Sequence, residues 1–434
     1  MDEQPLPDDL STIKTSKISQ ARVEKRKREL GPEHPDTLVS MNNLGFSYWK
    51  QGRWKEAEKL QLHVVESRKR VLGPDNPVTL STMASLGFAY WDEGQYKEAE
   101  ELQVYVLERY KRLLGPEHSN TLEIMNNLVC TYLDQGRFRE AEALQIEEFQ
   151  LSSRVRGPEH PDTLVSMGNL ASTYMKQGKW TEAESLQTKV IETYSRSLGR
   201  EHPSSLDSMA NLASIYREQE RWKEALDLSF EVVKARKEVL GPDHPDALGA
   251  MASMGSIYRE EGRSEEAEKI DVQVAEASME LFGPEDPKTL VSMSNLGSTY
   301  QGQGRFDEAE GIQEQVVHIS IEVRGPNHPS TLTNMANLGC TYQGQSRFEE
   351  AEGPETMVVE ARRQVLGPVH PDTVTSMNNL AFTYEASGKK EEALQLIGER
   401  VEILNQTLGR DHPSTIHTAA ALTEWRKADA SGSI

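Results

Sequence analysis

The sequence predicts an all-α fold, a right-handed superhelical solenoid of tandem helical hairpins. One observation is that ten glycines recur at intervals of 42 residues without an insertion: Gly31, Gly73, Gly115, Gly157, Gly199, Gly241, Gly283, Gly325, Gly367 and Gly409. Another is that apolar residues between these glycines are spaced by three and four, which places them on one face of a helix. A helix pair of this length cannot bury its apolar stripe alone, so each repeat is expected to stack on its neighbours.

Each repeat contains two predicted helices joined by a tight turn. In the first repeat they are residues 36–51 and 54–72, and the first of them has four apolar residues on one face: Leu38, Met41, Leu44 and Tyr48. Gly52 suits the left-handed residue that ends a helix, and Gly73-Pro74 ends the second helix because proline lacks an N–H donor. In later repeats, Glu220 and Ser346 stand where Gly52 stands in the first.

The repeat boundaries predict the domain organisation. We expect a disordered N-terminus at 1–12, a lone repeat helix at 13–30, nine hairpins at 35–412, a C-terminal capping helix at 413–427 and a disordered tail at 428–434. The chain therefore starts in the middle of a repeat. This start fits either a terminal cap or an N-terminally truncated product, and the sequence leaves both open.

Three residue types recur once per repeat and are interpreted as structural. Methionines are expected in the core at Met41, Met83, Met125, Met167, Met209, Met251, Met293, Met335 and Met377, and tyrosines between hairpins at Tyr48, Tyr90, Tyr132, Tyr174, Tyr216, Tyr258, Tyr300, Tyr342 and Tyr384. Histidines occupy one loop position at His34, His118, His160, His202, His244, His328, His370 and His412.

These histidines are predicted to cap helices rather than to bind metal. Successive copies lie at least about 8–10 Å apart, one helix packing distance, whereas zinc ligands lie about 2 Å from a common ion. Asn76 and Asp286 fill the same position in two repeats, and both are good N-cap residues. The following proline suits the first helical turn.

Composition narrows the function classes. A net charge of -21 disfavours nucleic acid and acidic membranes as partners, because both require clustered Lys and Arg. The chain has two cysteines, no signal-peptide pattern and no apolar run of about 18 residues, so we expect a cytoplasmic location. It contains no phosphate-binding glycine loop or metal-binding spacing, so we expect neither an enzyme nor a cofactor.

The residues 42–57 carry a family resemblance. Asn-Asn-Leu-Gly followed by Tyr48, Gly52-Arg53 and Glu56-Ala57 resembles the tetratricopeptide consensus. The 42-residue period with Leu-Gly-Pro-x-His-Pro loops, as at 240–245, is similar to kinesin light chain and related fungal repeat proteins, over about residues 13–426. The resemblance implies a groove, lined by the first helix of each hairpin, that binds extended peptides of partner proteins.

The same resemblance leaves several functions open. Kinesin light chains also have an N-terminal coiled coil that joins the heavy chain, and only about a dozen residues precede the first repeat helix here. Kinesin heavy chain is therefore not expected as a partner. Similar fungal arrays form the C-terminal sensor part of larger nucleotide-binding signalling proteins. The sequence predicts a non-catalytic adaptor, with such a sensor fragment and a self-associating scaffold as alternatives.

Asparagine recurs inside the predicted first helices although it is a mediocre helix former. The positions are Asn43, Asn127, Asn169, Asn211, Asn295, Asn337 and Asn379, with Ser85 and Ser253 in the remaining two hairpins. A side-chain amide has both a donor and an acceptor, so a ladder of them could hold a peptide backbone. In similar tetratricopeptide grooves the matching asparagines do so. The alternative is that they make only local hydrogen bonds.

Residues beside this asparagine ladder change along the chain, as specificity positions would. Candidates for a hydrophobic anchor are Phe46, Trp49, Phe88 and Trp91, and the later hairpins have Leu133, Met175, Arg217, Arg259, Gln301 and Gln343. Aromatic residues and arginine are the commonest interface hot spots. We expect Arg217 and Arg259 to accept an acidic group, unless the adjoining Glu218 and Glu260 neutralise them.

The eighth hairpin departs from the pattern. Gly353-Pro354 lies inside its predicted second helix, where proline costs roughly 3 kcal/mol or forces a kink. We therefore expect a bend or a short break near Gly353.

Overall fold

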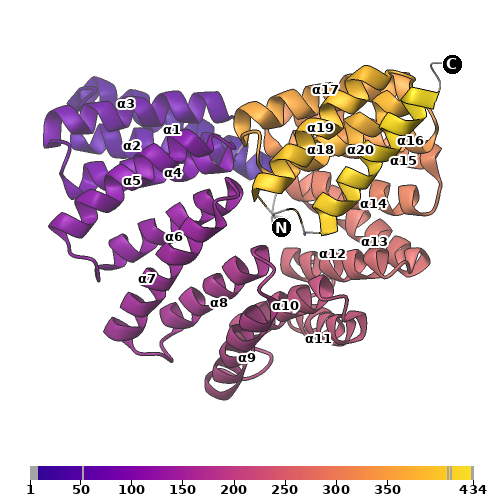
Figure 1. Cartoon of the computed structure of the whole chain (residues 1–434). Helices are drawn as coiled ribbons and strands as arrows, with labels where there is room; N and C mark the ends of the chain where they lie inside the picture. The colour runs from indigo at the N-terminus through magenta and orange to yellow at the C-terminus, as the bar shows by residue number, and fades with distance from the viewer. Residues whose placement is uncertain (1–7, 51–52, 408–409, 411–412, 432–434) are drawn as a thin grey trace, which may run out of the picture. The chain divides into compact units, whose positions relative to one another are not determined.

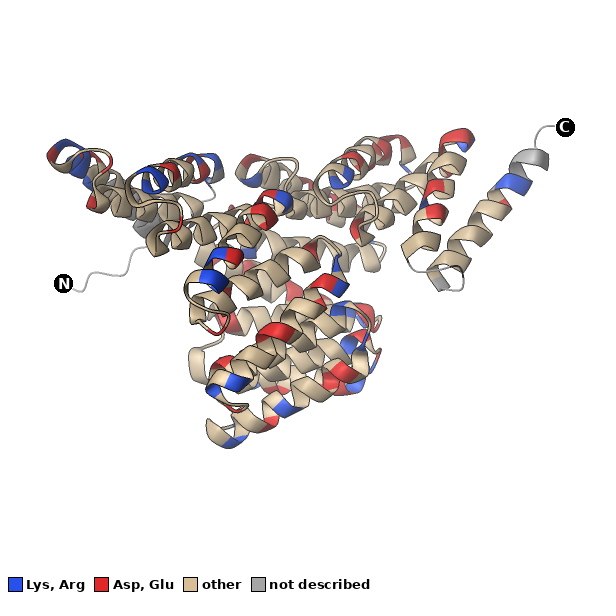
Figure 2. Ribbon diagram, turned by 60° about the vertical axis from the view of Figure 1, so that its left-hand side comes forward, with Lys and Arg blue, Asp and Glu red and all other residues tan. Residues whose placement is uncertain are grey.

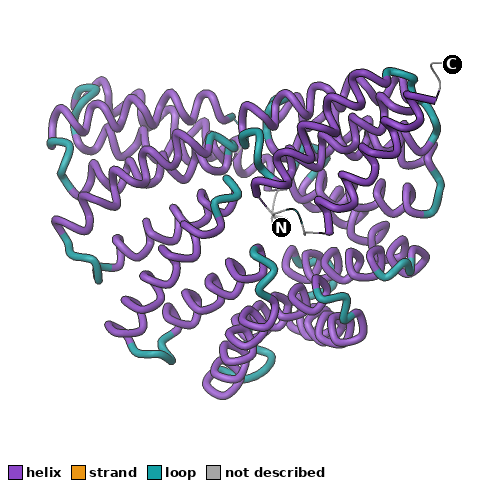
Figure 3. Tube along the Cα trace, viewed as in Figure 1, coloured by secondary structure: helices purple, strands orange, loops and turns teal. Residues whose placement is uncertain are grey.

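The computed structural model describes residues 8–50, 53–407, 410 and 413–431, and these residues form twenty α-helices and no strand (Figures 1 and 3). From α1 to α13 and from α15 to α20, each helix packs against the next one along the chain, so within each of these two stretches successive hairpins stack on one another. The predicted all-α solenoid of helical hairpins is confirmed.

The first helices of the nine hairpins begin at the residue after the predicted cap. Their bounds are α2 (Pro35–Lys50), α4 (Pro77–Asp92), α6 (Ser119–Asp134), α8 (Pro161–Lys176), α10 (Pro203–Glu218), α12 (Pro245–Glu260), α14 (Pro287–Gly302), α16 (Pro329–Gly344) and α18 (Pro371–Ala386). The second helices are α3 (Trp54–Leu72), α5 (Tyr96–Leu113), α7 (Phe138–Arg156), α9 (Trp180–Ser197), α11 (Trp222–Leu240), α13 (Ser264–Phe282), α15 (Phe306–Arg324), α17 (Phe348–Val365) and α19 (Lys390–Thr407).

The two terminal helices are longer than predicted. Helix α1 spans Asp8–Leu30 and α20 spans Pro413–Ser431, whereas the expected ranges were 13–30 and 413–427. Residues 8–12 and 428–431 are helical where disorder was expected, and 1–7 and 432–434 lie outside the described residues.

The chain divides into two units, residues 1–292 and 293–434, with the boundary inside α14. In the first unit, one core cluster runs through α3, α4, α5, α6 and α7 without a gap, and includes Val65, Met83, Tyr110, Met125 and Leu151. In the second unit, Val359, Met377, Ile397 and Leu422 join α17 to α20 in the same way. The periodic methionines are at most 9% exposed, so their predicted core role is confirmed.

The predicted caps are confirmed for the described residues. The Nδ1 atoms of His118, His160, His202 and His244 accept a hydrogen bond from the backbone N–H two residues later, each at 3.2 Å. Asn76 and Asp286 accept the equivalent bond at 2.9 and 2.7 Å. Each cap satisfies one of the N–H groups that have no partner within the helix. His412 lies outside the described residues.

The turn inside each hairpin needs a left-handed residue. Gly94, Gly136 and Gly178 have φ between 70° and 76°, and Glu220 and Ser346 have φ of 57° and 61° at the same position. Gly52 lies outside the described residues. A non-glycine residue pays a steric cost in this conformation, because its Cβ approaches the following carbonyl oxygen.

Replacing Glu220 or Ser346 by glycine should therefore stabilise the protein. We expect Glu220→Gly and Ser346→Gly each to add roughly 1 kcal/mol, seen as a higher melting temperature in circular dichroism. Gly136→Ser is the matched control and should lower the melting temperature. Equal melting temperatures for all three variants would show that these turns carry no strain.

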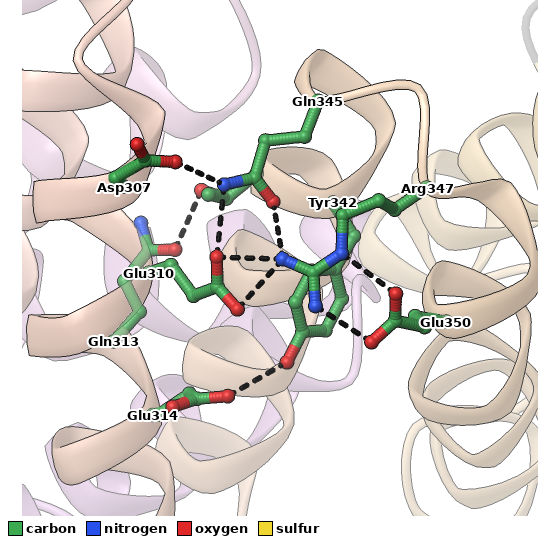
Figure 4. A network of polar contacts seen from close by, with 9 residues as sticks. Asp307, Glu310, Gln313, Glu314, Tyr342, Gln345, Arg347 and Glu350 are labelled. Carbon is green, nitrogen blue, oxygen red and sulfur yellow. Dashed lines mark hydrogen bonds and ion pairs between the residues drawn. The ribbon is translucent and has the colours of Figure 1, made fainter.

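A polar staple joins several hairpins to the previous one, and Figure 4 shows one example in the second unit. Arg347 lies over the Tyr342 ring with 4.7 Å between Cζ and the ring centroid, and its Nη1 donates to Glu310 at 2.7 Å. Its Nη2 donates to Glu350 at 2.6 Å, and the Tyr342 hydroxyl donates to Glu314 at 3.0 Å. The hydrogen bonds from Arg347 hold the pKa of the Glu310 and Glu350 carboxyls below their usual range.

The staple recurs wherever a cation and a carboxylate lie 37 residues apart; Leu226 takes the carboxylate position for Arg263, which pairs with Glu261 and Glu266 instead. Its cation meets the carboxylate of the preceding hairpin at 2.6 to 2.8 Å in the pairs Arg137–Glu100, Lys179–Glu142, Arg221–Glu184, Arg347–Glu310 and Lys389–Glu352. The same cation covers the periodic tyrosine of its own hairpin, as Arg137 covers Tyr132. This contact gives a reason for the tyrosine at the same position of each hairpin, beyond the predicted packing between hairpins.

The second hairpin has no cation in its staple. Gln95 occupies the position of Arg137, and its Nε2 donates to Glu93 at 2.9 Å. Burial, with the nearby charge of Glu58, raises the pKa of Glu93 to about 7, and burial also raises the pKa of Tyr90 to about 12. Two carboxylates therefore share this joint without an arginine between them.

Restoring the cation should stabilise this joint most above neutral pH. The Glu93 carboxyl titrates near 4.5 when unperturbed and near 7 in the fold, so its contribution to stability is lost as pH rises through that window. An arginine lowers the pKa of Glu93 and removes this loss. Gln95→Arg should raise the melting temperature more at pH 8 than at pH 5. Asn327→Arg, with the same charge change in a loop, should give no such difference between the two pH values.

Helix α17 contradicts the expected break near Gly353, because it runs uninterrupted from Phe348 to Val365 with Pro354 inside it. Pro354 removes a single hydrogen bond, the one to the carbonyl of Glu350. Its ring would clash with the Cβ of the preceding residue, but that residue is a glycine. The next turn is held by Val358, which is 1% exposed.

Candidate functional site

A hollow of about 360 Å³ lies on the first unit and brings together residues of three successive hairpins. It is lined by Phe46 of α2, by Ser81, Ala84, Ser85 and Phe88 of α4, by Tyr110 of α5, and by Asn120, Glu123, Ile124 and Asn127 of α6. Three of the predicted site residues, Phe46, Phe88 and Asn127, meet here.

Small side chains on α4 account for the hollow. Ser81, Ala84 and Ser85 stand where α6 has the larger side chains of Glu123, Asn126 and Asn127. The side chains of α4 therefore project less far from this face than those of α6. Ser85 is also one of the two serines that replace the ladder asparagine, and its hydroxyl donates to the Ser81 carbonyl at 3.1 Å. Because serine replaces asparagine at this ladder position, space remains between the residues of α2 and α6 that line the hollow.

The predicted aromatic anchor forms a continuous row beside the hollow. The ring centroids of Trp49 and Phe88 are 5.8 Å apart, and those of Phe88 and Trp91 are 5.3 Å apart. Phe88 keeps 36% of its surface exposed. Trp91 Nε1 donates to Asp134 of the next hairpin at 2.6 Å, which fixes the indole in place. A rigid, partly exposed aromatic surface is a common feature of binding sites.

The ladder asparagines are exposed or half-buried on the first helices, and they fall into two groups. Asn169 Nδ2 donates to Asn126 at 3.4 Å, Asn337 to Ser294 at 3.3 Å and Asn379 to the Cys340 sulfur at 3.4 Å. No hydrogen bond joins the amides of Asn43, Asn127, Asn211 or Asn295 to another described residue. Asn169, Asn337 and Asn379 thus make local hydrogen bonds, as the alternative to a peptide-binding ladder expects. The amides of the other four asparagines are available to a ligand.

The two arginines of the predicted anion site are paired within the chain. Arg217 Nη2 contacts Glu218 at 2.7 Å and its Nε lies 3.5 Å from Glu260. Arg259 forms an ion pair with Asp271, which is 1% exposed. Acceptance of an acidic group by these arginines stays a prediction, and a ligand would have to compete with these contacts.

Sequence reasoning missed the buried position to which Asp271 belongs. Its equivalents in other hairpins are Gln61, Gln103, Gln145, Gln187, Ser229, Gln313 and Glu355, again at intervals of 42. Three of them bond to the first helix of the next hairpin: Gln103 and Gln313 accept from Thr131 and Thr341 at 2.7 and 2.6 Å, and Gln187 donates to the Ser208 carbonyl at 2.9 Å. Where the residue is an acid, it binds the variable residue twelve positions before it, since Glu355 accepts from Gln343 at 2.8 Å just as Asp271 accepts from Arg259. The replacement of glutamine by an acid at Asp271 and Glu355 was the sequence signal that could have revealed this buried position.

Burial raises the pKa of Glu355 to about 7. The unperturbed carboxyl titrates near 4.5, so the folded state retains the proton more tightly, and stability falls as pH rises from about 4.5 to about 7.

Replacing Glu355 by glutamine, the residue of most other hairpins, should remove this loss. We expect Glu355→Gln to gain up to about 3 kcal/mol at pH 8 and little at pH 5, measured by chemical denaturation at both pH values. Gln313→Glu is the converse variant and should acquire the pH dependence that Glu355→Gln loses. An equal effect of Glu355→Gln at both pH values would contradict this account.

Other site classes receive no support from the described residues. Among them, no group of three or more His, Cys, Asp or Glu side chains could hold a metal ion. No described helix is both long enough and apolar enough to cross a membrane. Figure 2 shows acidic and basic segments interspersed along the helices.

A tetratricopeptide repeat family model matches residues 20–69, 36–104, 85–147, 131–174, 166–238, 211–273, 246–320 and 296–363, and a second such model matches 373–414. The chain belongs to the tetratricopeptide repeat family. The comparison with curated proteins gave no match.

Solved structures include similar repeats. One is of a Podosopora anserina protein named as a kinesin light chain with nearly identical repeats, 30% identical, covering 48% of this chain and 98% of that one, with a TM-score of 0.41. Another is BtubC from P. vanneervenii, 19% identical, covering 55% and 94%, with a TM-score of 0.43. A third is a Rap protein complexed with competence and sporulation factor, 11% identical, covering 91% and 99%, with a TM-score of 0.44. The resemblance of this tetratricopeptide repeat protein to kinesin light chain repeats is confirmed.

Proposed function

We propose that this tetratricopeptide repeat protein is a non-catalytic adaptor that binds extended peptide segments of partner proteins. The binding surface is the exposed face of the first helices in the first unit. The observation that carries the proposal is the hollow of about 360 Å³, because it combines an exposed aromatic ring, a ladder amide and contributions from three hairpins. Repeat proteins present extended surfaces of this kind, and extended peptides offer backbone groups at regular intervals.

The ladder amides supply the sequence-independent part of the binding. Asn127 borders the hollow, and Asn211 lies on α10 at the same position of its helix. An amide side chain can donate to a peptide carbonyl and accept from a peptide N–H at once. The row formed by Trp49, Phe88 and Trp91 supplies apolar contact area.

The triple variant Asn127→Ala, Asn169→Ala and Asn211→Ala tests the ladder. Each lost hydrogen bond is worth about 1 kcal/mol, so we expect partner binding to weaken at least tenfold while helicity is retained. Affinity capture of partner proteins and titration of one captured partner measure the loss.

The matched control is Asn327→Ala with Asn405→Ala, which removes amides from a loop and from the second helix α19. It should bind as the wild type does. If the triple variant also keeps the same partners at the same affinity, the asparagine ladder does not hold a peptide.

A further inference from the structure

The strongest observation beyond peptide binding itself is the charge of the hollow. Among the described residues that line it, Glu123 is the one with a charge, and none is Lys or Arg. Glu123 is exposed, and among the described residues no ion pair or hydrogen bond engages its carboxylate. Most other acidic residues near this face differ in this respect, since Asp134 accepts from Trp91, and Asp207 pairs with Arg236.

The face around the hollow is also acidic. At the positions four residues before and seven after the ladder residue, helices α4 to α12 carry six acids and one lysine: Asp92, Glu123, Asp134, Asp207, Glu218, Glu260 and Lys176. These positions share one helical face with the ladder. Arg217 offsets Glu218 and Glu260 of this set and Arg236 offsets Asp207, while Arg259 pairs with Asp271. The acidic character is therefore concentrated at Asp92, Glu123 and Asp134 of α4 and α6, two helices that line the hollow. A field of this sign attracts cationic segments and repels acidic ones.

Aromatic rings border the same space. Phe46 and Phe88 lie in the lining with Glu123, and Tyr110, which is 2% exposed, also contributes. A cation within about 6 Å of an aromatic ring is attracted by the ring's electron-rich face. The protein uses this contact within its own staples, where Arg221 lies 4.0 Å from the Tyr216 centroid and Arg137 lies 4.3 Å from that of Tyr132.

We propose that the hollow binds a lysine or arginine side chain of an extended partner peptide, with Glu123 as its counter-charge and the Phe46 and Phe88 rings against its stem. The proposal rests on the peptide-binding function and specifies the class of peptide: a basic residue at the position that enters the hollow. The ladder amides hold the backbone on either side of it. A purely apolar anchor would leave Glu123 without a role.

Selection of peptides on the full chain tests this proposal. Random displayed peptides of about twelve residues, a length suited to an extended site, are selected on the wild-type protein, and synthetic copies are titrated by fluorescence anisotropy. We expect enrichment of Lys or Arg at one position. Replacing that residue by norleucine should weaken binding about tenfold, because the ion pair and the ring contact are both lost.

A double-mutant cycle then assigns the contact to Glu123. Glu123→Gln should weaken the parent peptide about three- to fivefold, the range of an exposed ion pair, and leave the norleucine peptide unchanged. Glu192→Gln, the same change on the second helix α9, should affect neither peptide. Glu123 is exposed, and equal circular dichroism spectra establish that the variant is folded.

The outcomes separate this proposal from the general one. Selected peptides without basic enrichment, or a Glu123→Gln effect that is equal for both peptides, would overturn the cation site while leaving peptide binding in place. Basic peptides that depend on Glu123 but tolerate the triple asparagine variant would support the cation site and remove the ladder. Failure to select any peptide would overturn both.

Discussion

Stacking of hairpins is the constraint on which the rest of this protein depends. An isolated hairpin would leave the Leu and Met stripe of its first helix in water, and only the neighbouring hairpin can cover it. Met83 and Met125 are buried in this way within a single cluster that extends over five helices. Because the covering element is always the next repeat, any change in repeat length would misalign the buried stripes. The insertion-free spacing of 42 residues is the consequence.

The same spacing aligns a polar contact outside the core. In five hairpins, a cation just before the second helix reaches a carboxylate 37 residues earlier and covers the tyrosine of its own hairpin, as Arg347 does with Glu310 and Tyr342 (Figure 4). Exposed ion pairs contribute little singly, but here each also fixes one hairpin against another. The second hairpin has Gln95 in place of the cation, and there burial, with the nearby charge of Glu58, raises the pKa of Glu93 to about 7.

Packing uses the inner stripe of the first helices and leaves their outer face free to vary. Small residues on α4 open a hollow there, and the aromatic row from Trp49 to Trp91 borders it. The buried acids limit this freedom, because Asp271 and Glu355 draw Arg259 and Gln343 inward. The candidate site lies on the first three hairpins, where the position equivalent to Asp271 is glutamine: Gln61, Gln103 and Gln145. There no buried acid among the described residues draws the variable residue of the first helix inward.

The sequence by itself determined the repeat, the two helices in each, the histidine caps and the buried methionines. These features depend on local periodicity and on backbone groups a few residues apart, which spacing along the chain specifies directly. Only the tertiary structure decided that Phe46, Phe88, Glu123 and Asn127 meet in one hollow and that Arg259 is already paired. Such contacts depend on side-chain volumes and burial on neighbouring helices. The same reason applies to α17, where the absent Cβ of Gly353 and the packing of Val358 allow a proline that sequence rules alone would place at a break.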